Sequence, residues 1–159
     1  MTDNPYNSPN SQVESESHRT GSLWKGILFG GLADLGGTIV MSIIMISIYM
    51  ALNWSADMTP EKIEEVTNMF VEDSSSFNNI WGIIGLVFGL GFSVLGGYIC
   101  ALFAREKWKK AILILAAILT IYGLVMGSDI YQIGVLLVLT LLSIFAMLLG
   151  GWLRGGKRY

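Results

Sequence analysis

The sequence of 159 residues has only one cysteine, one histidine and three prolines, and charged residues make up just 14% of it. The single cysteine, Cys100, excludes an internal disulfide. The single histidine, His18, lies in a polar N-terminal stretch, which argues against a histidine-based metal site or acid–base site. With a hydrophobic content of 53%, the chain is too apolar for a soluble domain of this length. We therefore expect most of it to be surrounded by lipid.

Recognisable chemical motifs are also missing. The sequence has no paired carboxylates within an apolar run, no cysteine–histidine ligand set, no phosphate-binding loop and no constellation typical of a catalytic nucleophile. No cleavable signal peptide is evident, because the first apolar run begins near Leu23, is long and lacks a small-residue cleavage pattern after it. We expect no cofactor, no metal and no nucleic acid as a ligand, and no residues point to an enzyme.

Four apolar runs predict an all-α polytopic membrane protein with four transmembrane helices in an antiparallel bundle. We expect spans at about residues 24–52, 79–104, 110–127 and 130–153, since roughly 20 apolar residues cross a hydrocarbon core of about 30 Å. The third run is near the lower length limit. Residues 23–154 would form the transmembrane domain, between a disordered cytoplasmic tail at 1–22 and a basic cytoplasmic tail at 155–159.

The one sizeable polar connection, residues 53–79, predicts a short amphipathic helix at about 60–72. Thr59 is a suitable N-cap, and Pro60 fits the first helical position. Its apolar residues gather on one face and its acidic residues mostly lie elsewhere. The helix would either cap the bundle or lie on the membrane, and its acidic character favours capping because it does not attract anionic lipid.

The basic residues predict the orientation in the membrane. In the four-span layout nine of the ten lysines and arginines fall on one side, which obeys the positive-inside rule, and only Lys62 falls on the other. Both termini are therefore expected in the cytoplasm. The nine are Arg19, Lys25, Arg105, Lys107, Lys109, Lys110, Arg154, Lys157 and Arg158.

A tight basic turn is expected between the second and third spans. Its cationic side chains are Arg105, Lys107, Lys109 and Lys110. We interpret the turn mainly as a determinant of topology, with binding of anionic lipid headgroups as the alternative.

Small residues recur at helical spacing in the first two spans and give each helix a face that permits close packing. These faces have two interpretations: the two spans pack against each other, or they recognise a helix of a partner protein. The residues concerned are Gly26, Gly30 and Gly37 in the first span and Gly82, Gly85, Gly89, Ser93 and Gly96 in the second.

Asp34 is the one ionisable residue expected within a span, where a carboxylate costs about 2.5–3.5 kcal/mol on insertion scales. It therefore needs a partner or a proton. Tyr98 of the second span lies at a similar depth, so we predict an Asp34–Tyr98 polar pair. In a functional role, the carboxyl group would respond to an ion or a proton, or would anchor a partner helix. In a structural role, it would make a hydrogen bond within the bundle or snorkel to the membrane interface.

The segment GGYICALFARE, which includes Gly96, Gly97, Tyr98, Ala101 and Ala104, resembles a Gly-Gly-Tyr-x-x-x-Ala helix end. That helix end occurs in many small uncharacterised bacterial four-helix inner-membrane proteins, and the tail NPYNSPNS is similar to tails on such proteins. The turn that follows departs from them, because it is strongly basic and lacks a His-Gly. The resemblance implies a bacterial inner-membrane location and no activity.

The sequence favours a protein that acts by helix–helix interaction. Our leading hypothesis is an accessory, assembly or regulatory subunit that docks through its first two spans onto another membrane protein or a second copy of itself. The alternative is a small transporter or channel subunit that uses a groove beside Asp34. A lipid-modifying enzyme ranks third.

Overall fold

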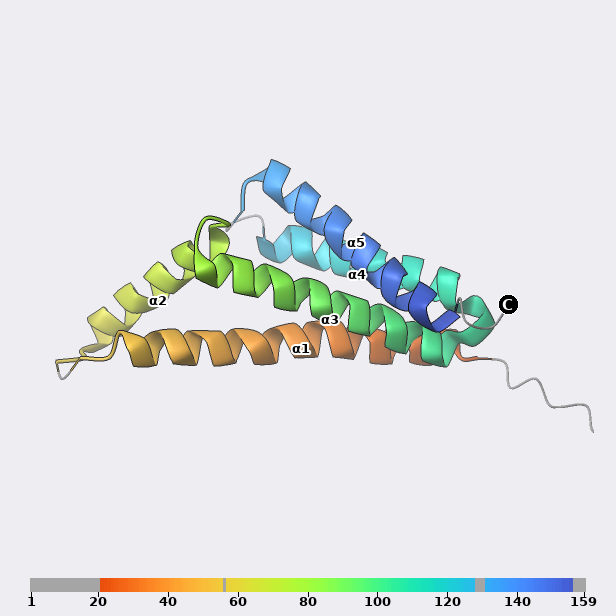
Figure 1. Cartoon of the computed structure of the whole chain (residues 1–159), viewed down its shortest axis with the longest axis horizontal. Helices are drawn as coiled ribbons and strands as arrows, with labels where there is room; N and C mark the ends of the chain where they lie inside the picture. The colour runs from red at the N-terminus through yellow and green to blue at the C-terminus, as the bar shows by residue number, and fades with distance from the viewer. Residues whose placement is uncertain (1–20, 56, 128–130, 156–159) are drawn as a thin grey trace, which may run out of the picture.

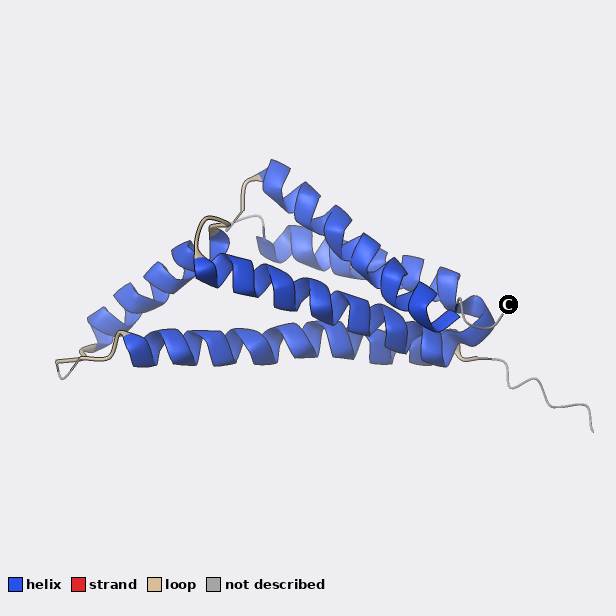
Figure 2. Ribbon diagram, viewed as in Figure 1, coloured by secondary structure: helices blue, strands red, loops and turns tan. Residues whose placement is uncertain are grey.

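The computed structural model describes residues 21–55, 57–127 and 131–155, and within these residues it is helical throughout, with no strand (Figure 2). One short 3₁₀ turn, η1 (Arg105–Lys107), joins two of the helices. The five α-helices are α1 (Leu23–Leu52), α2 (Pro60–Ser75), α3 (Ile80–Ala104), α4 (Trp108–Gly127) and α5 (Ile133–Gly155).

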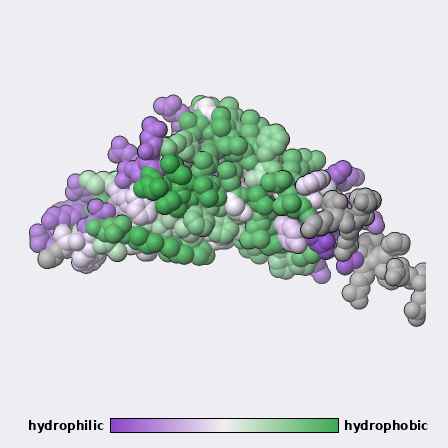
Figure 3. Space-filling view, viewed as in Figure 1, coloured by the Kyte–Doolittle hydropathy of each residue, from purple (hydrophilic) through white to green (hydrophobic). Residues whose placement is uncertain are grey.

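Three helical stretches are long and apolar enough to cross a membrane. They are α1, the stretch formed by α3 and α4 together, and α5. Hydrophobic side chains cover the middle of the face seen in Figure 3, and hydrophilic ones gather toward its two ends. An apolar exterior of this kind is stable in lipid rather than in water. The chain is therefore a helical membrane protein with more than one span.

The helix bounds lie within a few residues of those expected from the sequence. α1 begins at Leu23 and ends at Leu52, and α2 begins at Pro60 but continues one turn past residue 72, to Ser75. α5 begins at Ile133 and continues to Gly155, slightly later at both ends than the expected 130–153. The expected tails at 1–20 and 156–159 lie outside the described residues.

α3 is the central helix of the arrangement. α1 packs along one side of it and α5 along another, while α4 contacts all three (Figure 1). The start of α1, the α3–α4 turn and the end of α5 gather at one end of the molecule. A buried cluster that includes Ile27, Cys100, Ile112 and Met147 fills this end. From there α5 diverges from α3 toward the other end (Figure 1).

α2 packs across the far ends of α1 and α3. Tyr49 of α1 lies with its ring centroid 5.3 Å from that of Phe70 in α2 and 5.3 Å from that of Trp81 in α3. The Tyr49 hydroxyl donates a hydrogen bond of 2.7 Å to the Asp73 carboxylate, and the Asn79 side-chain amide donates another of 2.7 Å. One carboxylate thus ties the end of α1 to the N-cap of α3.

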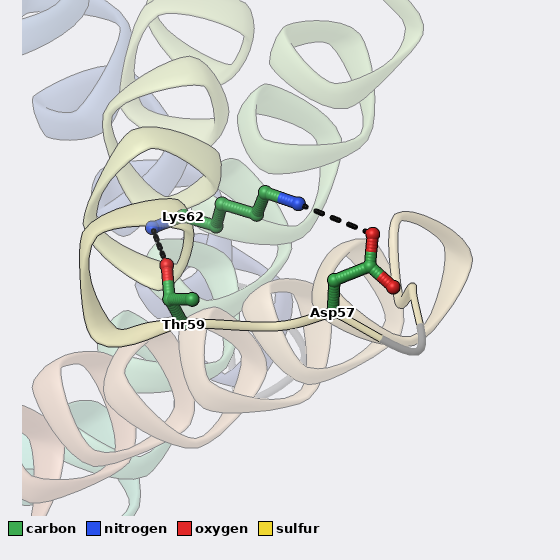
Figure 4. A network of polar contacts seen from close by, with 3 residues as sticks. All are labelled: Asp57, Thr59 and Lys62. Carbon is green, nitrogen blue, oxygen red and sulfur yellow. Dashed lines mark hydrogen bonds and ion pairs between the residues drawn. The ribbon is translucent and has the colours of Figure 1, made fainter.

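The first turn of α2 is held by local polar contacts (Figure 4). The Thr59 hydroxyl accepts a hydrogen bond of 3.4 Å from the Lys62 backbone N–H, as an N-cap does. The Lys62 ammonium lies 3.7 Å from the Asp57 carboxylate, and both side chains are well exposed. An exposed ion pair of this kind contributes little stability, so the N-cap matters more than the ion pair here.

Arg105 makes the reversal between α3 and α4. Its backbone has φ 48° and ψ −115°, and it is the only non-glycine residue with positive φ in the described part of the chain. These angles are those of the first central residue of a type II′ turn, a position that favours glycine. The short 3₁₀ turn is therefore obtained at the cost of local backbone strain.

Replacing Arg105 tests this strain. Arg105→Gly and Arg105→Ala both remove the guanidinium group, but only glycine adopts the observed angles freely. We expect the Gly variant to be more stable than the Ala variant by about 1 kcal/mol. Reversible unfolding of each variant in mixed detergent micelles measures the difference, and a more stable Ala variant would contradict the turn described here.

Candidate functional site

The backbones of α1 and α3 touch at their glycines. A Cβ atom added to Gly30 would lie 2.8 Å from the Gly96 carbonyl oxygen, and one added to Gly96 would lie 2.8 Å from the Gly30 carbonyl oxygen. A Cβ atom on Gly26 would lie 2.7 Å from the Cys100 carbonyl oxygen. No side chain fits in these positions, so the early residues of α1 face the late residues of α3. The two helices therefore run in opposite directions.

The remaining glycines singled out from the sequence divide into two groups. A Cβ atom on Gly37 would meet the Phe92 ring, and one on Gly82 would meet the Ser76 backbone. In contrast, Cβ atoms on Gly85 and Gly89 would find no heavy atom within 4 Å. The small-residue face of α3 is thus closed against α1 near Gly96 and open near Gly89.

A second close contact, between α3 and α5, was not expected from the sequence. A Cβ atom on Gly97 would meet the Met147 backbone, and one on Gly150 would meet the Val94 backbone. The signal was present, because Ser143, Ala146 and Gly150 follow one another at steps of three and four residues. This contact places Ser143 beside α3.

Asp34 lies where α1, α3 and α5 meet. Its side chain is 7% exposed, and that of Ser93 in α3 is 4% exposed. The Ser93 hydroxyl donates a hydrogen bond of 3.0 Å to Asp34 Oδ1, and the Ser93 and Ser143 hydroxyl oxygens lie 3.0 Å apart. The three side chains form one connected polar chain across three helices, which we call the Asp34–Ser143 chain.

The chemistry of the hydroxyl group fixes the direction of the Asp34–Ser143 chain. A serine hydroxyl has one proton to donate. Because Ser93 gives its proton to Asp34, the hydrogen bond between the two serines must be donated by Ser143. The Ser143 oxygen keeps its free lone pairs and becomes the outer end of the chain.

Tyr98 does not take the position expected for it. Asp34 is bonded to Ser93, no hydrogen bond joins it to Tyr98 among the described residues, and the Tyr98 side chain is 38% exposed. Tyr98 lies at a depth similar to that of Asp34, but its side chain points in another direction. Gly96 faces α1, and a residue two positions later points about 200° away around the helix. The expected Asp34–Tyr98 pair is thus replaced by Asp34–Ser93.

Two hollows lie beside α5. One, of about 180 Å³, lies between α4 and α5, and the hydroxyl-bearing residues Thr120, Thr140 and Ser143 contribute to its lining. The other, of about 390 Å³, is an almost wholly apolar groove between the diverging halves of α3 and α5. We call the first the α4–α5 cavity and the second the α3–α5 groove. Phe77, Leu86, Val135 and Val138 are among the residues that line the groove.

The basic turn lies at the end of the molecule where α1 begins and α5 ends (Figure 1). The side chains of Arg105, Lys107, Lys109 and Lys110 are exposed there, and the Lys109 ammonium lies 5.7 Å from the centroid of the Trp108 ring. The Trp108 ring itself lies against Gly151 and Gly155 of α5. The turn thus presents cationic groups outward while its tryptophan packs inward.

Removing the central hydroxyl tests the Asp34–Ser143 chain. Ser93→Ala deprives Asp34 of its side-chain donor, so we expect the free energy of unfolding to fall by about 1–3 kcal/mol. Ser143→Ala removes only the outer bond and should cost less, about 0.6 kcal/mol. Unfolding in mixed micelles measures both. An equal loss for the two variants would contradict the central position of Ser93.

Comparison with known proteins adds no assignment to these features. No protein-family model, curated protein or solved structure matches the chain. The likeness of the Gly96–Arg105 helix end to small bacterial inner-membrane proteins stays an expectation from the sequence. The site must therefore be interpreted from its own geometry and chemistry.

Proposed function

We propose that the chain crosses the bacterial inner membrane four times, as an antiparallel bundle with both termini in the cytoplasm. α3 and α4 would be separate spans, since their 25 and 20 residues each suffice to cross the hydrocarbon core. The exposed basic turn between them supports a cytoplasmic position for that end of the molecule. Its cationic side chains would also lie at the level of anionic lipid headgroups.

We further propose that the protein is an accessory, assembly or regulatory subunit that binds a helix of a different membrane protein. The observation that carries this proposal is the α3–α5 groove, a hollow of about 390 Å³ lined by apolar side chains. Leu86 of α3 lines it, and so does Gly134 of α5, whose Cβ position is open. A groove bordered by glycine permits close approach of another helix.

The half of the small-residue face near Gly96 is already used within the chain. Gly26, Gly30 and Gly96 bring α1 and α3 together and have no room for a partner. Docking through the whole of the first two spans, as the sequence suggested, would require these helices to separate. The proposal is therefore limited to the half of α3 near Gly89 and to the part of α5 that faces it.

Charge favours a different protein over a second copy as the occupant. Phe77, at the rim of the groove, follows α2 directly. Two copies joined at this groove would bring two acidic α2 helices close together, which is unfavourable. A partner with basic residues just outside its span would complement this end. The exposed acids are Asp57, Glu61, Glu64, Glu65 and Glu72, against the single Lys62.

A photocrosslinking residue placed at Val138 tests the groove directly. Val138 lines it and is 57% exposed, whereas Ile43 on α1 is equally exposed, at 58%, but does not line it. In native membranes we expect one discrete protein adduct from position 138, none from position 43, and loss of the adduct when the leucine side chain of Gly134→Leu occupies the groove. Mass spectrometry identifies the product. An adduct to a second copy, or the same adducts from both positions, would refute the proposal.

A matched pair of variants tests whether the small-residue face of α3 is open near Gly89 and closed near Gly96. Gly89→Leu adds a side chain to open space and should leave the unfolding of the isolated protein nearly unchanged. Gly96→Leu forces a side chain into the α1 backbone, so it should destabilise the bundle by several kcal/mol. A strongly destabilised Gly89→Leu protein would show that this half of α3 is packed inside the molecule.

The alternative function, a small transporter or channel subunit, rests on the Asp34–Ser143 chain. Asp34 itself lines neither of the two described hollows, and its carboxylate is connected to the α4–α5 cavity only through two serine hydroxyls. Neither of these two hollows gives a solute larger than a proton a path to the carboxylate. The docking function is therefore the better supported of the two.

A further inference from the structure

We propose that Asp34 is a proton-binding site that exchanges with the α4–α5 cavity through Ser143 and Ser93. This inference does not rest on the docking function, because Asp34, Ser93 and Ser143 do not line the α3–α5 groove. It rests on three features: a buried carboxyl group, a hydrogen-bonded path whose donors all point toward Asp34 while that carboxyl group is ionised, and a cavity with hydroxyl groups at the outer end of the path.

The path conducts a proton by shifts within existing hydrogen bonds. A hydronium ion in the cavity gives one proton to Ser143 Oγ and becomes water. Ser143 passes its original proton to Ser93, and Ser93 passes its own proton to Asp34 Oδ1, each across a 3.0 Å contact. Asp34 is then a neutral carboxylic acid and each serine again holds one proton. Every hydrogen bond in the chain has reversed direction, and release follows the same steps backward.

The α4–α5 cavity supplies the outer end of the path. Along α5 its lining extends from Leu136 to Met147, which are eleven helical steps or about 17 Å apart. Ser143 lies within this length, and Thr120 and Thr140 place two further hydroxyl-bearing side chains on the lining. Hydroxyl groups allow water to be held in a hollow of this size, about 180 Å³. The cavity thus reaches from the level of Ser143 toward the α4–α5 connection.

A proton is the ligand that this set of groups fits. Only the carboxyl group of Asp34 and two serine hydroxyls meet, whereas hard metal cations take six or more oxygen ligands. No group of three or more His, Cys, Asp or Glu residues that could hold a metal occurs among residues 21–55, 57–127 and 131–155. Lipid and packed helices surround the Asp34 carboxylate, and an unpaired charge in such surroundings is costly. Binding a proton removes this charge.

No cation within the described residues competes for the Asp34 carboxylate. On its own helix the nearest charged residue is Lys25, nine positions earlier and exposed. Gly96 and Ser93 of α3 face Asp34. The α5 hydroxyl group, that of Ser143, contacts Ser93 and not Asp34 itself. The other titratable or charged groups of these helices, of η1 and of α4 lie elsewhere along or around them: Tyr49, Tyr98, Cys100, Arg105, Glu106, Lys107, Lys109, Lys110, Tyr122 and Arg154.

Infrared spectroscopy of the full chain in lipid vesicles tests the site. We expect the carbonyl stretch of a protonated carboxyl group to grow as the pH is lowered, over the range in which the protein stays folded. The band should shift when aspartate is labelled with ¹³C and should be missing in Asp34→Asn. Because the label enters all five aspartates, Asp34→Glu completes the assignment: it keeps a carboxyl group at this position, and its band should no longer shift with the aspartate label. The assignment therefore holds even if the Asn variant does not fold.

The path is tested by the rate at which the band responds to photolysis of a caged proton. Ser143→Ala should slow the response about 100-fold, since a positioned proton-transfer group contributes at least that much, and should leave its final size unchanged. Gly123→Leu should also slow it, because Gly123 lines the cavity and its Cβ position is open. Gly134→Leu is the matched control: its Cβ position is equally open, but it lines the α3–α5 groove.

Four results would overturn the proposal. The first is a wild-type band that does not change with pH, and the second is a pH-dependent band without an aspartate isotope shift. The third is an unchanged rate in both Ser143→Ala and Gly123→Leu. The fourth is loss of the band when sodium ions are added at constant pH, which would assign the carboxylate to a metal cation. A pH-dependent aspartate band that Ser143→Ala and Gly123→Leu slow, and Gly134→Leu does not, supports it.

Discussion

The direct contact between the backbones of α1 and α3 at Gly30 and Gly96 determines the rest of the arrangement. Lipid supplies no hydrophobic force between helices, so close packing and interhelical hydrogen bonds must hold them together. Because the α1 and α3 backbones are in contact, the Asp34 carboxylate lies within 3.0 Å of the Ser93 hydroxyl. The approach of α5 at Gly150 then brings Ser143 within hydrogen-bond distance of Ser93. Glycine contacts and the polar chain are therefore one structural unit.

The two ends of the bundle differ in how tightly the helices are packed. Near Gly96 and Gly150 a Cβ atom would overlap a neighbouring backbone, and the polar chain lies at this closed level. Toward Gly89 the helices separate and leave an apolar groove, with α2 joining α1 to α3 beyond it. This difference in packing separates helix docking at the α3–α5 groove from proton binding at Asp34. A helix that enters the groove need not disturb Asp34.

The sequence predicted the features that depend on distance along a helix. The lengths of the apolar runs predicted the helix bounds to within a few residues. The position of Asp34 along its helix predicted a contact at the level of Tyr98, five residues from the partner that is observed, Ser93. Direction around the helix axis was harder to predict. Ser93 and Tyr98 lie at similar depth, but only the register between α1 and α3 decides which of them faces Asp34. The Gly97–Gly150 approach was not predicted, because small residues at helical spacing in α5 do not by themselves show which helix they face.

The Asp34–Ser143 chain also imposes an order on biosynthesis. Asp34 and Ser93 are 59 residues apart in the chain, and Ser93 and Ser143 are 50 apart. At roughly 5–20 residues per second, the ribosome needs on the order of 3–12 s to reach Ser93 after Asp34 has been made. During that interval α1 holds its acidic residue without a partner from another helix. The polar chain is therefore among the last contacts to form, and it exists only in a molecule whose α1, α3 and α5 have all been inserted.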